Sequence, residues 1–492
     1  MAGNTSFTGK AQAADTGKQQ NYTLPLVVLT SLFFMWGFLT CMNDILIPAL
    51  KEVFQLTFFQ AFLVQFAFFG AYFIGSLIYF FISVRYGDPI NKIGYKNGII
   101  AGLLISAVSC ALFYPAAEYK VYGYFLTALF TLGLGFTLLQ IAANPYVAIL
   151  GPEETASSRL NLSQAFNSFG TTIAPLIGGY LIFEYFAGEG GALNADSVKV
   201  PYLVFAATFL LVALLIKVVH LPRVTNEDNI EPGAGALKYP HLVLGMFAIF
   251  FYVGGEVTIG SMLINFFEQD NIMSLPKSEG DVFLAFYWGG AMTGRFIGAI
   301  SLSGMKNGGR KLGLMVLVAL FSFGVIYGSS LVKTGFNLDF ERVAPFLLLV
   351  AANLVAFMAG RALPGRTLVI FALINLFLLG VTITGVGALA FWAVIGIGLF
   401  NSIMWSNIFT LAIDGLGKYK SQGSSLLVMM ILGGALIPPL QGKIADLTGP
   451  QLSFLVPVVC YLYLAFYGFK GYKAGRSQDV DKQALTGEGL ES

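Results

Sequence analysis

The chain has 492 residues, of which 56% are hydrophobic, 15% aromatic and only 11% charged, and its mean hydropathy is +0.75. Because soluble domains carry about 25% charged residues, this composition excludes an ordinary soluble protein. The formal net charge of +2 does not point to a partner by itself. The positions of the charges along the chain are more informative.

Apolar stretches that are long enough, or nearly so, to cross about 30 Å of hydrocarbon recur along the chain. Because lipid offers no hydrogen-bond partners to the backbone, runs of this length must be helices. The sequence therefore predicts an all-α polytopic membrane protein with fourteen transmembrane helices. They are expected near 25–50, 60–84, 98–115, 122–150, 162–186, 201–219, 241–267, 281–301, 312–332, 344–360, 367–385, 388–413, 422–441 and 452–470. Residues 1–24 are polar, so we expect a disordered cytoplasmic tail there and no cleavable signal.

The lysines and arginines concentrate in alternate loops, on the side that also holds the N-terminus. Arg85, Lys92, Lys96, Lys306 and Arg310 are examples among the 28 basic residues. Because cytoplasmic loops carry an excess of Lys and Arg, we expect both termini in the cytoplasm. Basic residues that act as topology signals predict no nucleic acid partner.

The sequence carries no pattern typical of an enzyme. Its three cysteines, Cys41, Cys110 and Cys460, lie in apolar segments without paired spacing, so we expect packing residues without a disulfide or a metal. Neither a Cys/His cluster nor a nucleophile triad is evident. We expect no enzymatic activity and no cofactor apart from a coupling ion.

The chain repeats itself. Gly133 matches Gly396 and Gly170 matches Gly433, each at a distance of 263 positions, whereas Phe33 matches Phe250 at a distance of 217. Parallel repeats of six helices are a known transporter plan. The sequence therefore predicts a six-helix bundle over 25–219, a cytoplasmic linker over 220–240, a second bundle over 241–470 and a cytoplasmic tail over 471–492.

The two distances differ by 46 positions. About that many residues, roughly 340–385, hold two apolar segments without a counterpart in the first half. We infer an inserted helical hairpin there, because only an even number of extra helices keeps the later helices in the same orientation. Glycine-rich pieces such as Gly133-Leu-Gly135 and Gly396-Ile-Gly398 are expected to permit close helix packing.

Three charged residues, Asp44, Glu256 and Arg295, lie inside long apolar segments. A charge at the bilayer centre costs roughly 2.5–3.5 kcal/mol, and membrane proteins that accept this cost usually move an ion or a polar solute. The pattern indicates a transporter. Structural pairing of the acids, and an interhelical or snorkelling role for Arg295, are the alternatives.

The sequence also resembles a known family. The loop Gly87-Asp-Pro-Ile-Asn91-Lys92-Ile-Gly94-Tyr-Lys96 resembles the cytoplasmic signature of the major facilitator superfamily, with Asn91 in place of its usual acid. Other stretches look like the fucose:proton symporter branch of that superfamily, which includes bacterial glucose/galactose and N-acetylglucosamine permeases. These stretches are Asn43-Asp44-Ile-Leu-Ile-Pro48, Ala142-Ala-Asn144-Pro145, Gly151-Pro-Glu153 and Arg159-Leu-Asn161-Leu-Ser-Gln164-Ala-Phe-Asn167-Ser-Phe-Gly170.

The resemblance implies the major facilitator fold and alternating access around one sugar site between the bundles. The resemblance also implies that Asp44 is the acid that binds the coupling ion. The second acid of the fucose symporters is replaced by Gln140, and Glu256 appears instead, which resembles the glucose/galactose type. Glu256 is expected to bind the sugar, carry a proton or ligate Na⁺, with Arg295 as its counter-ion or that of Asp44.

A sugar site needs amides and carboxylates for the hydroxyl groups and an aromatic face for the ring. The candidates for substrate binding are Gln65, Gln140, Asn144, Gln164, Asn167, Tyr252, Glu256, Asn401, Trp405 and Asn407. Such amides also hydrogen-bond neighbouring helices and hold bundles together, which is the alternative for each.

Together with this resemblance, the sequence predicts a hexose:cation symporter of the glucose/galactose type that works as a monomer in the lipid bilayer of a bacterial inner membrane. The proton is the first choice of coupling ion and Na⁺ is the rival. The alternatives are an N-acetylglucosamine or fucose symporter, or a drug or anion carrier of the same superfamily.

Overall fold

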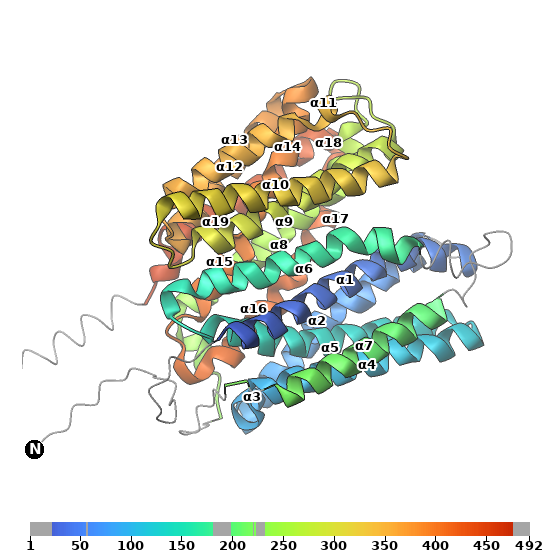
Figure 1. Cartoon of the computed structure of the whole chain (residues 1–492). Coiled ribbons are helices and arrows are strands. Elements are labelled where there is room, and N and C mark those ends of the chain that lie inside the picture. Colours follow the sequence, from blue (N-terminus) through green and yellow to red (C-terminus); the bar gives the residue numbers. More distant parts are fainter. Residues whose placement is uncertain (1–21, 56–57, 181–197, 220, 223–231, 476–492) are drawn as a thin grey trace, which may run out of the picture.

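The structure, a computed structural model, describes residues 22–55, 58–180, 198–219, 221–222 and 232–475. The regular elements of this part of the chain are all helices, and Figure 1 shows them in two bundles. The N-terminal bundle holds α1 (Thr23–Val53), α2 (Phe58–Tyr86), α3 (Pro89–Ile93), α4 (Tyr95–Tyr119), α5 (Tyr122–Ile149), α6 (Ala156–Tyr180) and α7 (Lys199–Val218).

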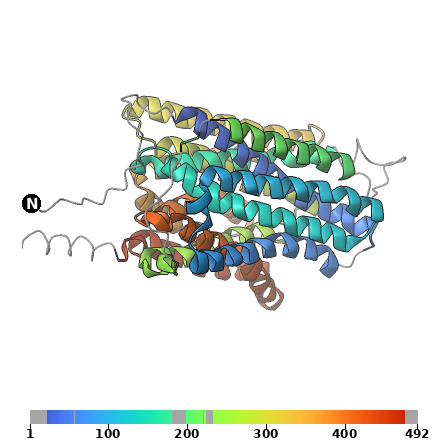
Figure 2. The same ribbon diagram turned by 90° about the horizontal axis from the view of Figure 1, so that it is seen from below.

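The C-terminal bundle is larger. Its helices are α8 (Pro240–Phe267), α9 (Lys277–Ser301), α10 (Gly308–Lys333), α11 (Phe340–Val343), α12 (Pro345–Gly360), α13 (Pro364–Thr384), α14 (Gly387–Asn401), α15 (Met404–Ile413), α16 (Lys420–Met429), α17 (Gly433–Thr448), α18 (Pro450–Ser453) and α19 (Leu455–Phe469). Short 3₁₀ turns include η1 (Glu153–Thr155), η5 (Gly235–Lys238), η6 (Gly417–Tyr419), η7 (Met430–Leu432) and η8 (Gly471–Lys473). The end of the molecule that carries α3 is called the α3 end below; α1 begins and α19 ends there (Figures 1 and 2).

Within the described residues, 12 helical segments are long and apolar enough to cross a membrane. The expectation of fourteen such segments is not confirmed, because α6 and α9 do not meet this standard. Both are 25 residues long, but α6 carries a row of Ser, Asn and Gln side chains and α9 begins with charged residues. The two helices pack against each other where the bundles meet, so their polar groups face protein and need less apolar character.

The repeat inferred from the sequence has a counterpart in the packing. Helix α1 packs along α6 as α8 packs along α17, and α2 packs on α5 as α9 packs on α14. A Cβ atom added to Gly170 of α6 would lie 2.3 Å from the Phe34 carbonyl oxygen, and one added to Gly433 would lie 2.0 Å from that of Phe250. The helix axes approach this closely only because glycine has no side chain. The expected packing role of Gly398 is confirmed in the same way, since an added Cβ atom would lie 2.1 Å from the Tyr287 carbonyl oxygen.

The packing places the extra helix pair elsewhere than expected. In the N-terminal bundle α4 lies against both α5 and α7, and in the C-terminal bundle α13 lies against both α14 and α19. Helix α13 is therefore the counterpart of α4, and a shift of 263 positions brings residues 364–384 onto 101–121, within or next to α4. The extra pair is α10 and α12, not the segment 340–385. Helices α10, α12 and α13 follow one another and are similarly long and apolar, so their length and hydropathy do not show which two of them are the extra pair.

Candidate site between the two bundles

Glu256 lies near the middle of the 28-residue helix α8 and is 9% exposed. The Tyr252 hydroxyl, one turn earlier, donates a hydrogen bond of 2.7 Å to Glu256 Oε1. The same oxygen lies 3.7 Å from Arg295 Nη2 on α9. A carboxylate in an apolar bundle is tolerated when a cation and a hydrogen-bond donor compensate it, and both are present here.

Arg295 connects three elements. Its Nε donates a 3.0 Å hydrogen bond to the Ser402 carbonyl oxygen, at the break between α14 and α15 where backbone groups lack helical partners. Its Nη1 donates to the Ser168 hydroxyl on α6. Because α6 belongs to the N-terminal bundle, Arg295 joins the two bundles at the level of Glu256. This arrangement combines two of the predicted coupling residues and adds Ser168 and Ser402.

A fully buried polar network lies behind Glu256. The Tyr287 hydroxyl donates a 2.9 Å hydrogen bond to the Glu256 carbonyl oxygen and accepts one of 3.0 Å from Asn401 Nδ2. Asn401 Oδ1 accepts from Asn375 at 3.0 Å and from the Tyr461 hydroxyl. The amide of Asn401 thus makes hydrogen bonds to helices of its own bundle. This is the alternative stated for the predicted sugar ligands, namely that they hold the helices together.

In the N-terminal bundle, two of the predicted amides lie one turn apart on α5. Gln140 is 4% exposed and its side chain adjoins the Tyr72 hydroxyl, which also adjoins Trp36. Asn144 is completely buried, and neither its nitrogen nor its oxygen has a hydrogen-bond partner within the described part of the protein. Buried polar atoms are normally paired, so Asn144 has the capacity to bind a polar ligand.

The next two predicted amides lie on α6. Gln164 is 8% exposed, and its amide makes no hydrogen bond to the described residues. Asn167 Nδ2 instead donates a 3.0 Å hydrogen bond to the Phe33 carbonyl oxygen, and so connects α6 to α1. Gln164 is free to bind a ligand, whereas Asn167 is partly committed to helix packing.

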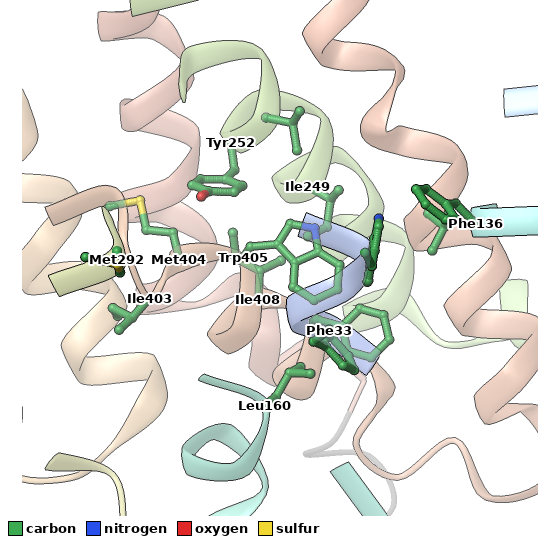
Figure 3. Close-up of a cluster of buried hydrophobic side chains, with 14 of the residues drawn as sticks. Phe33, Phe136, Leu160, Ile249, Tyr252, Met292, Ile403, Met404, Trp405 and Ile408 are labelled. Atoms are coloured by element: carbon green, nitrogen blue, oxygen red, sulfur yellow. The ribbon is translucent and has the colours of Figure 1, made fainter. Parts of the chain in front are cut away.

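Trp405 supplies an aromatic surface at the same boundary. It is 9% exposed and stacks on Phe409, with ring centroids 4.9 Å apart and an interplanar angle of 14°. Figure 3 shows its indole between Tyr252 of α8 and Phe33 of α1, within a wall of apolar side chains from both bundles. The predicted pair Tyr252 and Trp405 therefore lies together.

The side chains of two predicted residues, Asp44 and Gln65, lie outside the described residues. Asp44 is on α1 and Gln65 is on α2. Both helices contact α5, which carries Gln140 and Asn144.

The bundles are held together by hydrogen bonds at the α3 end. Asn161 Nδ2 of α6 donates to Asn407 Oδ1 at 3.2 Å, and the hydroxyls of Ser157 and Thr410 are 2.6 Å apart. Asn407 also donates a 3.2 Å bond to the Pro364 carbonyl oxygen. Asn407, a predicted sugar ligand, therefore uses its side chain to hold the two bundles together at the α3 end.

The loop before α4 adds a second set of cross-bundle contacts. Asn91 Nδ2 donates to the Lys418 carbonyl oxygen at 2.7 Å, and the Ser421 hydroxyl donates to Asp88 Oδ2 at 2.6 Å. Burial raises the pKa of the Asp88 carboxyl above its usual range, against the hydrogen bonds from Ser421 and Tyr79 that lower it. A carboxylate three residues before Asn91 thus takes part in the contact between the bundles.

Two carboxyl groups meet at the same end. A hydrogen bond with the Asp414 side chain, together with burial and the charge of Asp414, raises the pKa of Glu153 in η1 to about 6. Lys420 acts in the opposite direction and Glu154 in the same direction. Because Glu153 belongs to the N-terminal bundle and Asp414 to the C-terminal bundle, the α3 end closes over a pair of acids that favours one shared proton.

Sequence reasoning missed Ser168, Ser402 and Tyr287. A serine in a membrane helix is too common to single out, and Ser402 acts through its main-chain carbonyl, which no residue type signals. Ser168 directly follows Asn167, a predicted sugar ligand, and Tyr287 precedes Trp288 in an aromatic pair. In the sequence, only these neighbours could have indicated that Ser168 and Tyr287 belong to the site.

Known proteins resemble this chain over nearly its whole length. The sequence profile of the Major Facilitator Superfamily matches residues 27–359. The glucose/galactose transporter of Brucella abortus (biovar 1, strain 9-941) is 42% identical over 463 residues, covering 94% of this chain and 97% of that protein. The L-fucose-proton symporter of Escherichia coli (strain K12) is 32% identical over 492 residues, covering 94% and 98%. A fucose:proton symporter structure in the outward conformation superposes with a TM-score of 0.72 at 29% identity, covering 92% and 99% of the two chains.

Proposed function

This chain belongs to the Major Facilitator Superfamily, and we propose that it is a hexose:cation symporter of the glucose/galactose type. The observation that carries the proposal is the paired carboxylate Glu256 with Arg295 at the boundary between the bundles, in a chain related to glucose/galactose transporters and L-fucose-proton symporters. No enzymatic step and no cofactor are needed for this function.

The coupling ion is a proton in this proposal. Symport requires a group whose charge is cancelled when the ion binds, because reorienting an uncompensated charge in hydrocarbon is costly. Asp44 and Glu256 are the two acids available in apolar segments, and Arg295 balances Glu256 while it is ionised. A Na⁺ ion held by the same acids would satisfy the same requirement, and it remains the second candidate.

The sugar is bound between the bundles. Gln164, Asn144 and Gln140 provide amides from the N-terminal bundle, and Asn167 lies three residues after Gln164 on α6. Tyr252, Glu256 and Trp405 provide a hydroxyl, a carboxylate and a ring face from the C-terminal bundle. This combination of amides with one aromatic face suits the hydroxyl and C–H surfaces of a hexose.

The α3 end faces the cytoplasm of a bacterium, and the bundles are closed there, as in an outward-facing state. Basic residues such as Lys92, Lys306 and Arg361 gather at this end, which agrees with the positive-inside rule. Helices α6 and α9 also cross the inner membrane, since 25 residues at 1.5 Å each reach about 37 Å. The protein then has fourteen spans, both termini in the cytoplasm, and functions as a monomer.

The test is sugar uptake by proteoliposomes that contain a pH-sensitive dye. Glucose, galactose, N-acetylglucosamine and fucose are added in turn in Na⁺-free buffer. We expect glucose and galactose to drive acidification of the lumen, and Asp44→Asn and Glu256→Gln to abolish it. Glu341→Gln in α11, outside the site, serves as the control and retains full activity.

Each alternative outcome has one meaning. Sugar uptake that requires Na⁺ and leaves the pH unchanged would replace the proton by Na⁺ as coupling ion. Acidification by fucose or N-acetylglucosamine alone would change the named sugar. Absence of uptake of all four sugars, with and without Na⁺, would refute the sugar carrier itself.

A further inference from the structure

A groove with a volume of about 410 Å³ lies along α2, outside the site described above. Gly70 lines it, and an added Cβ atom there would have nothing within 4 Å. Phe66 and Phe73 of α2 and Phe130 of α5 line it as well. So does Leu432 of η7, which belongs to the C-terminal bundle. The groove therefore lies across the line where the bundles meet.

The groove opens on the surface of α2 that faces away from the protein. Phe66, Ile74 and Phe81 recur along this helix and are 72%, 42% and 61% exposed. They belong to the apolar span Phe66–Tyr86, so the solvent around them is hydrocarbon. Only a molecule already dissolved in the bilayer reaches the groove from this side.

The lining offers no polar group to a ligand. Its one hydroxyl, that of Thr127, already donates a 2.9 Å hydrogen bond to the Gly123 carbonyl oxygen. A sugar would lose its hydration there without compensation, whereas an apolar chain loses nothing. The volume lies within the range of small-molecule sites, about 300–1,000 Å³.

The opposite line of contact between the bundles is covered differently. There α6 meets α9, and the extra helix α10 packs on α9 and reaches α6, with the rings of Phe321 and Phe169 6.3 Å apart. At the boundary of α2 and η7, by contrast, the lining residues Phe66 and Ile74 remain 72% and 42% exposed. One boundary is thus covered by protein, and the other presents an apolar groove to the bilayer.

We propose that one acyl chain of a membrane phospholipid occupies this groove and bridges α2 and α5 of the N-terminal bundle to Leu432 of the C-terminal bundle. The chain fills the space above Gly70 and covers this boundary as α10 covers the other. Since its lining comes from both bundles, the groove keeps its shape only while the bundles hold their present arrangement. Bound lipid therefore stabilises the state that is closed at the α3 end.

The experiment counts lipids that remain bound to the whole protein after detergent extraction, by native mass spectrometry. Gly70→Phe places a ring in the open space beside Gly70 and so fills part of the groove. Ile78→Phe is the matched control, because Ile78 is on the same helix, 51% exposed and outside the lining. We expect the unmodified protein and Ile78→Phe to retain one phospholipid more than Gly70→Phe.

A second measurement keeps the proposal testable if Gly70→Phe does not fold. In the detergent-extracted protein, a photoreactive diazirine residue in place of Phe73 is expected to crosslink to the retained phospholipid. The same residue at Ile78 is expected to do so at least fivefold less, because detergent replaces the bulk lipid there. Equal lipid retention in both Phe variants, equal crosslinking at both positions, or adducts with detergent alone would each overturn the proposal. None of these outcomes depends on which solute the protein transports.

Discussion

Ser168 of α6 and Arg295 of α9 meet across the boundary between the two bundles, where the guanidinium donates a hydrogen bond to the hydroxyl. Another nitrogen of the same guanidinium lies 3.7 Å from Glu256 Oε1. The acid proposed to bind the coupling ion is therefore two contacts away from the opposite bundle. Protonation of Glu256 would weaken its attraction to Arg295. The position of Arg295 would then change, and with it the hydrogen bond to Ser168 that joins the two bundles.

The first prediction concerns Ser168→Ala. A hydrogen bond to a charged group contributes about 1.5–3 kcal/mol, so its loss shifts the equilibrium toward the state open at the α3 end by about 10- to 150-fold. Spin labels at Lys92 and Lys306, both exposed and on different bundles, report the distance by pulsed electron resonance. Ser163→Ala is the control, because the buried Ser163 hydroxyl has no partner within the described residues. Identical distance distributions for the two variants would contradict the prediction.

The second prediction separates amides that bind sugar from amides that hold helices. Gln164→Ala is expected to raise the KM for sugar at least tenfold and to leave the melting temperature nearly unchanged, because its amide has no hydrogen bond to lose within the described structure. Asn401→Ala is expected to lower the melting temperature, since it leaves Tyr287, Asn375 and Tyr461 without their partner. Each unpaired buried group costs about 1–3 kcal/mol.

Thermal unfolding in detergent and uptake kinetics in liposomes measure the two effects. The prediction fails if Asn401→Ala unfolds like the unmodified protein, or if Gln164→Ala lowers stability as much as Asn401→Ala.

The contrast between these amides shows where sequence reasoning ends. Hydropathy and the motifs around Asn144 and Gln164 were sufficient to predict an all-helical membrane protein of the major facilitator fold and its relatives, but not the number of spans that the structure confirms. They did not say which side of a helix each amide occupies, because nearly every side of α14 and α15 is buried. The choice between Gln164 and Asn401 depends on the Tyr287 hydroxyl, which comes from a helix more than 100 positions away. The position of the extra pair depends likewise on how α13 packs against α19.

The third prediction is a dependence on pH at the α3 end. The pKa of Glu153 is about 6 while Asp414 faces it, above its ordinary value of 4.5. A carboxyl whose pKa is raised in one state stabilises that state while it is protonated. The closed α3 end is therefore favoured at low pH, and this contribution is lost as the pH rises from 4.5 through about 6.

Glu153→Gln is expected to remove most of this dependence and to keep the end closed at pH 7.5. The labels at Lys92 and Lys306 measure it between pH 5 and pH 8. Glu118→Gln, at the opposite end of the N-terminal bundle, is the control and retains the dependence. A pH profile of Glu153→Gln that matches the unmodified protein would reject the role of the Glu153–Asp414 pair.

The fourth prediction tests the close approach of α8 and α17. Gly433→Ala places a Cβ atom 2.0 Å from the Phe250 carbonyl oxygen, far inside contact distance, so the helices must separate. Overpacking of this kind costs about 1–3 kcal/mol or more, and we expect a clear fall in melting temperature. Gly442→Ala is in the same helix with nothing within 4 Å of the added atom. There the change removes backbone freedom from the unfolded chain and raises stability by about 0.4–1 kcal/mol. Opposite signs for two identical substitutions in one helix would show that the contact with Phe250, and not helix propensity, requires glycine at position 433. Equal effects would mean that α8 and α17 do not approach each other this closely.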